Sequence, residues 1–81
     1  MDRRSSPRHR VLKTGKIVVN AGRSTFDCTV RNLSDTGALL LVASSIGIPD
    51  QFQLVISAEP PRPCRVVRRT AQELGVSFVI D

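Results

Sequence analysis

The 81-residue sequence contains no Trp and no Tyr, and it has only three Phe, two Cys and one His. Metal sites and catalytic triads need several convergent ligands or a His beside a nucleophile, and His9 has no such neighbour in the sequence. No Gly-rich phosphate loop precedes a helical pattern either. We therefore expect a protein that is not an enzyme and that holds no metal and no cofactor.

Long apolar runs are also missing. No stretch approaches the roughly 18 apolar residues of a membrane span, and the polar N-terminus lacks the apolar core of a signal peptide. We expect a cytoplasmic protein with no membrane span. In that reducing compartment, Cys28 and Cys64 are expected to be buried free thiols rather than a disulfide.

Positive charge is abundant and unevenly placed. The chain has 12 Lys and Arg against 7 Asp and Glu, and half of the basic residues fall within the first 16 positions. Such a cluster favours a polyanionic partner, namely nucleic acid, acidic lipid or a phosphorylated ligand, with a solvated basic tail as the alternative. Residues 1–12 show no useful apolar periodicity, so we predict a flexible basic arm there and a single folded domain over 13–81.

The rest of the chain has the pattern of short strands. Alternating or continuous apolar residues predict strands over 16–20, 24–30, 38–42, 51–57, 64–70 and 74–80. The segment Glu59–Pro63 has three prolines that would remove ladder donors, so we predict a loop there. Six evenly spaced strands without a convincing helix predict a small antiparallel β-barrel or sandwich, and closure into a barrel would leave no open sheet edge.

A polar turn, Asn32–Gly37, separates two of these strands. Asn, Ser, Asp and Gly favour tight turns, and Gly also reaches positive φ without penalty. By period-2 alternation, Asn32 continues the face of Cys28 and Val30, so we expect its amide to point across the barrel mouth. An ordinary turn and a binding site both fit this segment.

Two short motifs stand in order on this strand pattern. Arg4 and Arg8 form RxxxR, and Asn32, Ser34 and Gly37 form [D/N]xSxxG. With the later strands Cys64-Arg65-Val66-Val67-Arg68 and Gly75-Val76-Ser77-Phe78, nearly the whole chain resembles the PilZ domain family. The resemblance implies a six-stranded split β-barrel that binds the bacterial second messenger cyclic di-GMP and acts as an effector or adaptor.

The sequence also departs from that pattern. Arg68 stands where similar sequences often have an aromatic residue. Many of those sequences continue into a helix after the sixth strand, whereas this one ends at Asp81, so we expect no substantial C-terminal helix.

The resemblance implies six ligand-binding residues: Arg3, Arg4, Arg8, Asn32, Ser34 and Gly37. Arginine suits this ligand because its guanidinium forks onto phosphate and onto guanine O6 and N7. The Asn32 carbonyl oxygen can accept from the guanine N1 and N2 donors. Because the arginines precede every predicted strand, we expect the arm to become ordered when ligand binds.

Two other functions fit parts of the pattern. One is a degenerate barrel of the same family that acts only through protein–protein interaction, and an adaptor would in any case need a downstream protein partner, which the sequence does not identify. The other is a small basic nucleic-acid-binding barrel. Such barrels stack bases on exposed aromatics, whereas the three Phe here fall on alternating apolar faces, so nucleic acid is the less favoured partner.

Overall fold

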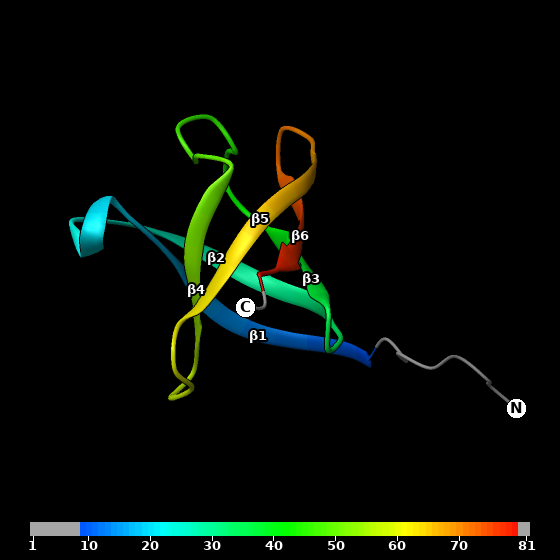
Figure 1. The fold of residues 1–81 in the computed structure, drawn as a ribbon. Coiled ribbons are helices and arrows are strands. Elements are labelled where there is room, and N and C mark those ends of the chain that lie inside the picture. The colour runs from blue at the N-terminus through cyan, green and yellow to red at the C-terminus, as the bar shows by residue number, and fades with distance from the viewer. Residues whose placement is uncertain (1–8, 80–81) are drawn as a thin grey trace, which may run out of the picture.

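The structure is a computed structural model that describes residues 9–79, with side chains from residue 12 onward. Six antiparallel strands close into a barrel in the order β1-β2-β3-β6-β5-β4, as Figure 1 shows. The predicted six-stranded antiparallel barrel is therefore confirmed. The strands are β1 (His9–Val19), β2 (Ser24–Leu33), β3 (Gly37–Leu41), β4 (Gln51–Ile56), β5 (Arg62–Arg69) and β6 (Glu73–Phe78), with the short 3-10 turn η1 (Asn20–Gly22) between β1 and β2.

The first strand begins earlier than its sequence pattern indicates. β1 starts at His9, inside the segment predicted as an arm, whereas apolar alternation becomes recognisable only near Lys16. The reason is backbone pairing: His9 lies opposite Leu33, and Arg10 lies opposite Asn32. Residues 1–8 of the predicted arm lie outside the described residues.

Pro63 lies inside β5, although the sequence places it in a loop. It is opposite Gln53 of β4, and its carbonyl accepts a hydrogen bond from the Val79 N–H at 2.9 Å. The N–H and C=O of one strand residue point to the same neighbour, so the missing N–H of Pro63 faces Val79, just past the end of β6. Proline is tolerated here because it sits at the start of the strand.

The barrel interior is filled by alternating side chains from all six strands. A closed core of this kind in so small a domain depends on aliphatic residues, and six aliphatic side chains in it are at most 2% exposed. These six are Ile17, Val30, Leu40, Leu54, Ile56 and Leu74. Phe26 and Phe78 are partly buried and pack against this cluster.

The two ends of β5 each carry an arginine that closes one end of the barrel. Arg62 places its guanidinium 4.9 Å from the centroid of the Phe78 ring and contacts Glu59 at 3.3 Å. At the other end, Arg69 donates to the Ser45 carbonyl at 2.8 Å and to Asp50 at 2.9 Å. Arg69 thereby fixes the long β3–β4 connection against the barrel.

Both cysteines lie in the core as free thiols, as predicted. Cys28 is 5% exposed and Cys64 is 1% exposed. The pKa of each thiol is raised to about 11, mainly because burial disfavours the thiolate, and for Cys28 the neighbouring Asp27 carboxylate contributes to the increase. The thiols are therefore protonated packing groups at neutral pH.

These raised pKa values predict a loss of stability in alkali. A thiol in the unfolded chain ionises near pH ~8.5, whereas the buried thiols stay protonated until the pH approaches 11. The free energy of unfolding should therefore have its full value below pH ~8.5 and should fall as the pH rises toward 11. Urea denaturation between pH 8 and 11 measures this fall. A Cys28→Ala/Cys64→Ala protein should lose less stability over the same range, and an equal loss in both proteins would contradict the assignment.

Candidate functional site

A β-bulge in β2 decides where the side chain of Asn32 points. Val30 lies opposite Leu40 while Asn32 lies opposite Leu39, so Arg31 is an extra residue relative to β3. After this bulge Leu33 packs against the core and Asn32 lies on the outer face with Leu39. The expectation that Asn32 continues the inner face of Val30 is wrong. Strict alternation would have exposed Leu33 and buried an unpaired amide, at a cost of about 1–3 kcal/mol.

A second bulge lies in β5. Val66 is opposite Val76 and Arg68 is opposite Gly75, which leaves Val67 as the extra residue. Val66 packs against the core, whereas Val67 and Arg68 are both exposed. The bulge serves the same purpose as the first, because unbroken alternation from Cys64 would have directed the Arg68 charge into the barrel.

The two bulges border one groove on the outer face of the barrel. Asn32, Leu39, Gly75 and Arg68 are successive cross-strand partners, so they form one row across β2, β3, β6 and β5. The groove has a volume of about 310 Å³. It is lined by Asn32, Leu33, Ser34, Thr36, Gly37, Ala38, Leu39, Val67, Arg68, Gly75, Val76 and Ser77.

The floor of the groove is apolar and its rim is polar. Leu39 is only half-buried on this outer face, so β3 is not covered on both sides as its continuous apolar run suggested. Gly75 adds no side chain to the floor. The rim consists of the Asn32 amide, the turn hydroxyls and the Arg68 guanidinium. An apolar floor with a few polar groups around it is typical of small-molecule sites.

Ser34 holds the turn together through its own hydroxyl. Its Oγ accepts from the backbone N–H groups of Thr36 and Gly37, each at 3.3 Å. Its backbone N–H donates to the Gly37 carbonyl at 2.9 Å, which closes the turn. Ser34 therefore fixes the segment between Asn32 and Gly37, while the Asp35 side chain between them is exposed.

Gly37 is required by a close approach of two strands and not by its backbone angles. Glycine is common in turns because it can adopt positive φ, but Gly37 does not have a positive φ. A Cβ atom at this position would lie 2.2 Å from the Val76 carbonyl oxygen. The third residue of the motif thus allows β3 to pack against β6 beneath the groove.

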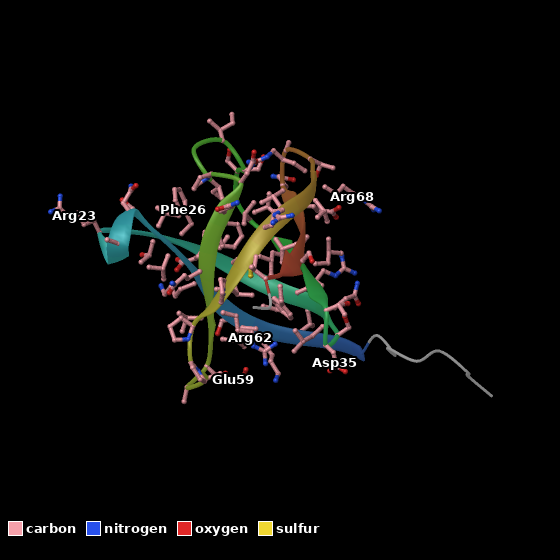
Figure 2. All side chains as sticks on the ribbon, viewed as in Figure 1. Arg23, Phe26, Asp35, Glu59, Arg62 and Arg68 are labelled. Carbon is pink, nitrogen blue, oxygen red and sulfur yellow. The ribbon has the colours of Figure 1, made fainter. Side chains whose placement is uncertain are left out.

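Among the described residues, Arg68 is the one basic side chain that lines the groove. Within the described residues, Lys16, Arg62 and Arg69 pair with carboxylates. Four further arginines, Arg23, Arg31, Arg65 and Arg68, have no carboxylate within 4 Å among those residues. Figure 2 shows Arg68 and Asp35 on the side of the barrel that carries β3, with Arg23 beyond the opposite end.

The first motif joins the barrel beside this groove. Arg3, Arg4 and Arg8 lie outside the described residues, so the structure does not place them. Arg8 is nevertheless bonded to His9, which lies opposite Leu33, the residue after Asn32. Figure 1 shows the start of β1 next to the turn between β2 and β3. The RxxxR segment is thus tethered at the edge of the second motif.

Another hollow, of about 760 Å³, has no residue of the Asn32–Gly37 turn in its lining. Its lining comes from β1, β2 and the ends of β3 and β4, and includes Lys16 and Asp27. These two charges pair with each other, so they leave little local field for a charged ligand. Across the described part of the chain there is no helix with the length and apolarity to span a membrane, and no group of three residues suited to hold a metal ion.

The comparison with protein families agrees with this geometry. The model of the PilZ domain matches residues 2–81, so the chain belongs to the PilZ domain family. No curated protein matches the chain.

Arg68 and Gly75 belong to the groove but were not among the residues selected from the sequence. A signal was present: Arg68 falls at an inward position if alternation from Cys64 is continued, and a charge cannot stay in so small a core. The same argument applies to Asn32: continued alternation from Val30 would bury a polar amide, which would have indicated the bulge in β2.

The contact beneath Gly37 predicts that Gly37→Ala destabilises the barrel. The added methyl group would overlap the Val76 carbonyl, so we expect a loss of about 1–3 kcal/mol in the free energy of unfolding, measured by urea denaturation. Asp35→Ala is the matched control, because this exposed side chain in the same turn should change stability by less than about 0.5 kcal/mol. Equal effects would show that the close approach is not what requires glycine.

Proposed function

We propose that this protein binds cyclic di-GMP on the outer face of the barrel and acts as a small effector or adaptor rather than as an enzyme. The observation that carries the proposal is the coincidence of three features: the [D/N]xSxxG turn borders the groove, RxxxR is tethered beside it, and the chain belongs to the PilZ domain family. The resemblance links that family to this ligand.

The groove offers groups that match one face of the ligand. The Asn32 carbonyl oxygen can accept from the N1 and N2 donors of a guanine resting on the apolar floor of Leu39 and Gly75. Ser34 and Gly37 support this contact, because their hydrogen bonds fix the turn that follows Asn32. Asn provides a neutral acceptor, so its bonds are weaker than those of a carboxylate.

The arm is proposed to supply the remaining contacts. A volume of about 310 Å³ is at the lower end for small-molecule sites, so the groove accommodates only part of a ligand with two guanines and two phosphates. Arg8 adjoins His9, and Arg4 is within about 14 Å of Arg8 along an extended chain. We propose that both guanidiniums, together with that of Arg3, bind the phosphates and the exposed base.

Isothermal calorimetry with cyclic di-GMP tests the proposal. Asn32→Ala and Arg8→Ala should each weaken binding by roughly five- to 150-fold, the effect of losing about 1–3 kcal/mol of hydrogen bonding to a charged or base group. Arg23→Ala, which removes an equal charge far from the groove, should leave the Kd within about twofold, because its exposed charge is distant and screened. GTP should give no saturable heat.

Two results would contradict the proposal. If cyclic di-GMP gives no heat of binding at tens of micromolar protein, the protein would instead be a PilZ-type barrel that acts only through protein–protein interaction. Saturable binding to single-stranded DNA or RNA, with an affinity that falls steeply with salt, would indicate contact with many phosphates instead of two.

A further inference from the structure

Arg68 is the one long cationic side chain of the described residues that lines the groove, and neither short motif includes it. It lies opposite Gly75, in the same cross-strand row as Asn32. Strands are spaced by about 4.8 Å, so three strand steps separate Asn32 from Arg68 by about 14 Å along the curved sheet, and by less in a straight line. Both residues line the one groove, Asn32 from β2 and Arg68 from β5.

Nothing in the described structure restrains the Arg68 guanidinium. It makes no ion pair with the described carboxylates, whereas Arg62 and Arg69 on the same strand are both paired. Glu73 is also on the outer face, two residues before Gly75, but it is not within 4 Å of the Arg68 guanidinium. The charge therefore remains available to a ligand.

We infer that Arg68 is a specificity-determining residue that reads the O6 and N7 edge of the guanine held by Asn32. This inference rests on the proposed function. A base lying flat on Leu39 and Gly75 presents its edges within the plane of the floor, toward the side chains at the two rims. Asn32 accepts from the donors on one edge, and Arg68 donates two parallel bonds to the acceptors on the next.

Gly75 makes this arrangement possible. A Cβ atom at residue 75 would lie 3.3 Å from the Arg68 Cβ atom, in the space between the base and the arginine. The bulge at Val67 is equally necessary, because it turns Arg68 outward. Adenine would present an amino donor where guanine has O6, so the same arginine disfavours it.

The test is the Kd of cyclic di-GMP for Arg68→Ala, Arg68→Lys and the unaltered protein. We expect roughly a tenfold or greater loss for both variants, because lysine keeps the charge but cannot form the two parallel bonds. Arg65→Ala is the matched control: Arg65 is exposed on the same strand, it does not line the groove, and its loss should change the Kd by less than about threefold. Unfolding midpoints verify that all variants are folded.

Competition with cyclic di-AMP provides the second measurement. The preference for cyclic di-GMP should shrink in Arg68→Ala, because only the guanine ligand loses a contact. Two results would show that Arg68 acts only as a general positive charge: an unchanged Kd for Arg68→Lys, or equal losses of affinity in Arg65→Ala and Arg68→Ala. Either result would overturn the inference and leave the proposed function intact. If the unaltered protein does not bind cyclic di-GMP, both the function and the inference fail.

Discussion

The change of side-chain alternation at the two bulges is the constraint on which the groove depends. A barrel of this size has room inside only for aliphatic side chains, so an amide or a guanidinium at an inward position must be turned out. The extra residues Arg31 and Val67 accomplish this in β2 and β5. As a result, Asn32 and Arg68 lie on the outer face with Leu39 and Gly75, and the groove is a consequence of keeping the core apolar.

The barrel beneath the groove is held by contacts within the protein itself, including two residues of the [D/N]xSxxG motif. Gly37 lets β3 approach β6 closely, and Ser34 closes the turn with its own hydrogen bonds. At the two ends of β5, Arg62 covers Phe78 and Arg69 anchors the β3–β4 connection. These contacts among the described residues hold the turn in place, which is the preorganisation that the proposed site needs.

Most of the fold followed from the sequence because each strand has a clear inner face. Alternation is regular in β4, in β6, in β2 as far as Val30 and at the start of β5, and these stretches include both buried cysteines. The start of β1 and the position of Pro63 did not follow, because both depend on which strand lies alongside. The outward direction of the Asn32 side chain and the position of Arg68 in the groove were missed for a related reason. A bulge is a change in the pairing of two neighbouring strands, so the sequence of one strand alone does not reveal it.

The most direct test of this account is to map the binding face by nuclear magnetic resonance with 15N-labelled protein and cyclic di-GMP. If the ligand occupies the outer groove, the largest amide shift changes should fall on Asn32, Gly37, Gly75 and Arg68, with slowed amide exchange in residues 2–8. Amides around η1 should remain unchanged. Largest changes at Thr14, Cys28 and Ser57, which line the other hollow, would place the ligand elsewhere and contradict the account.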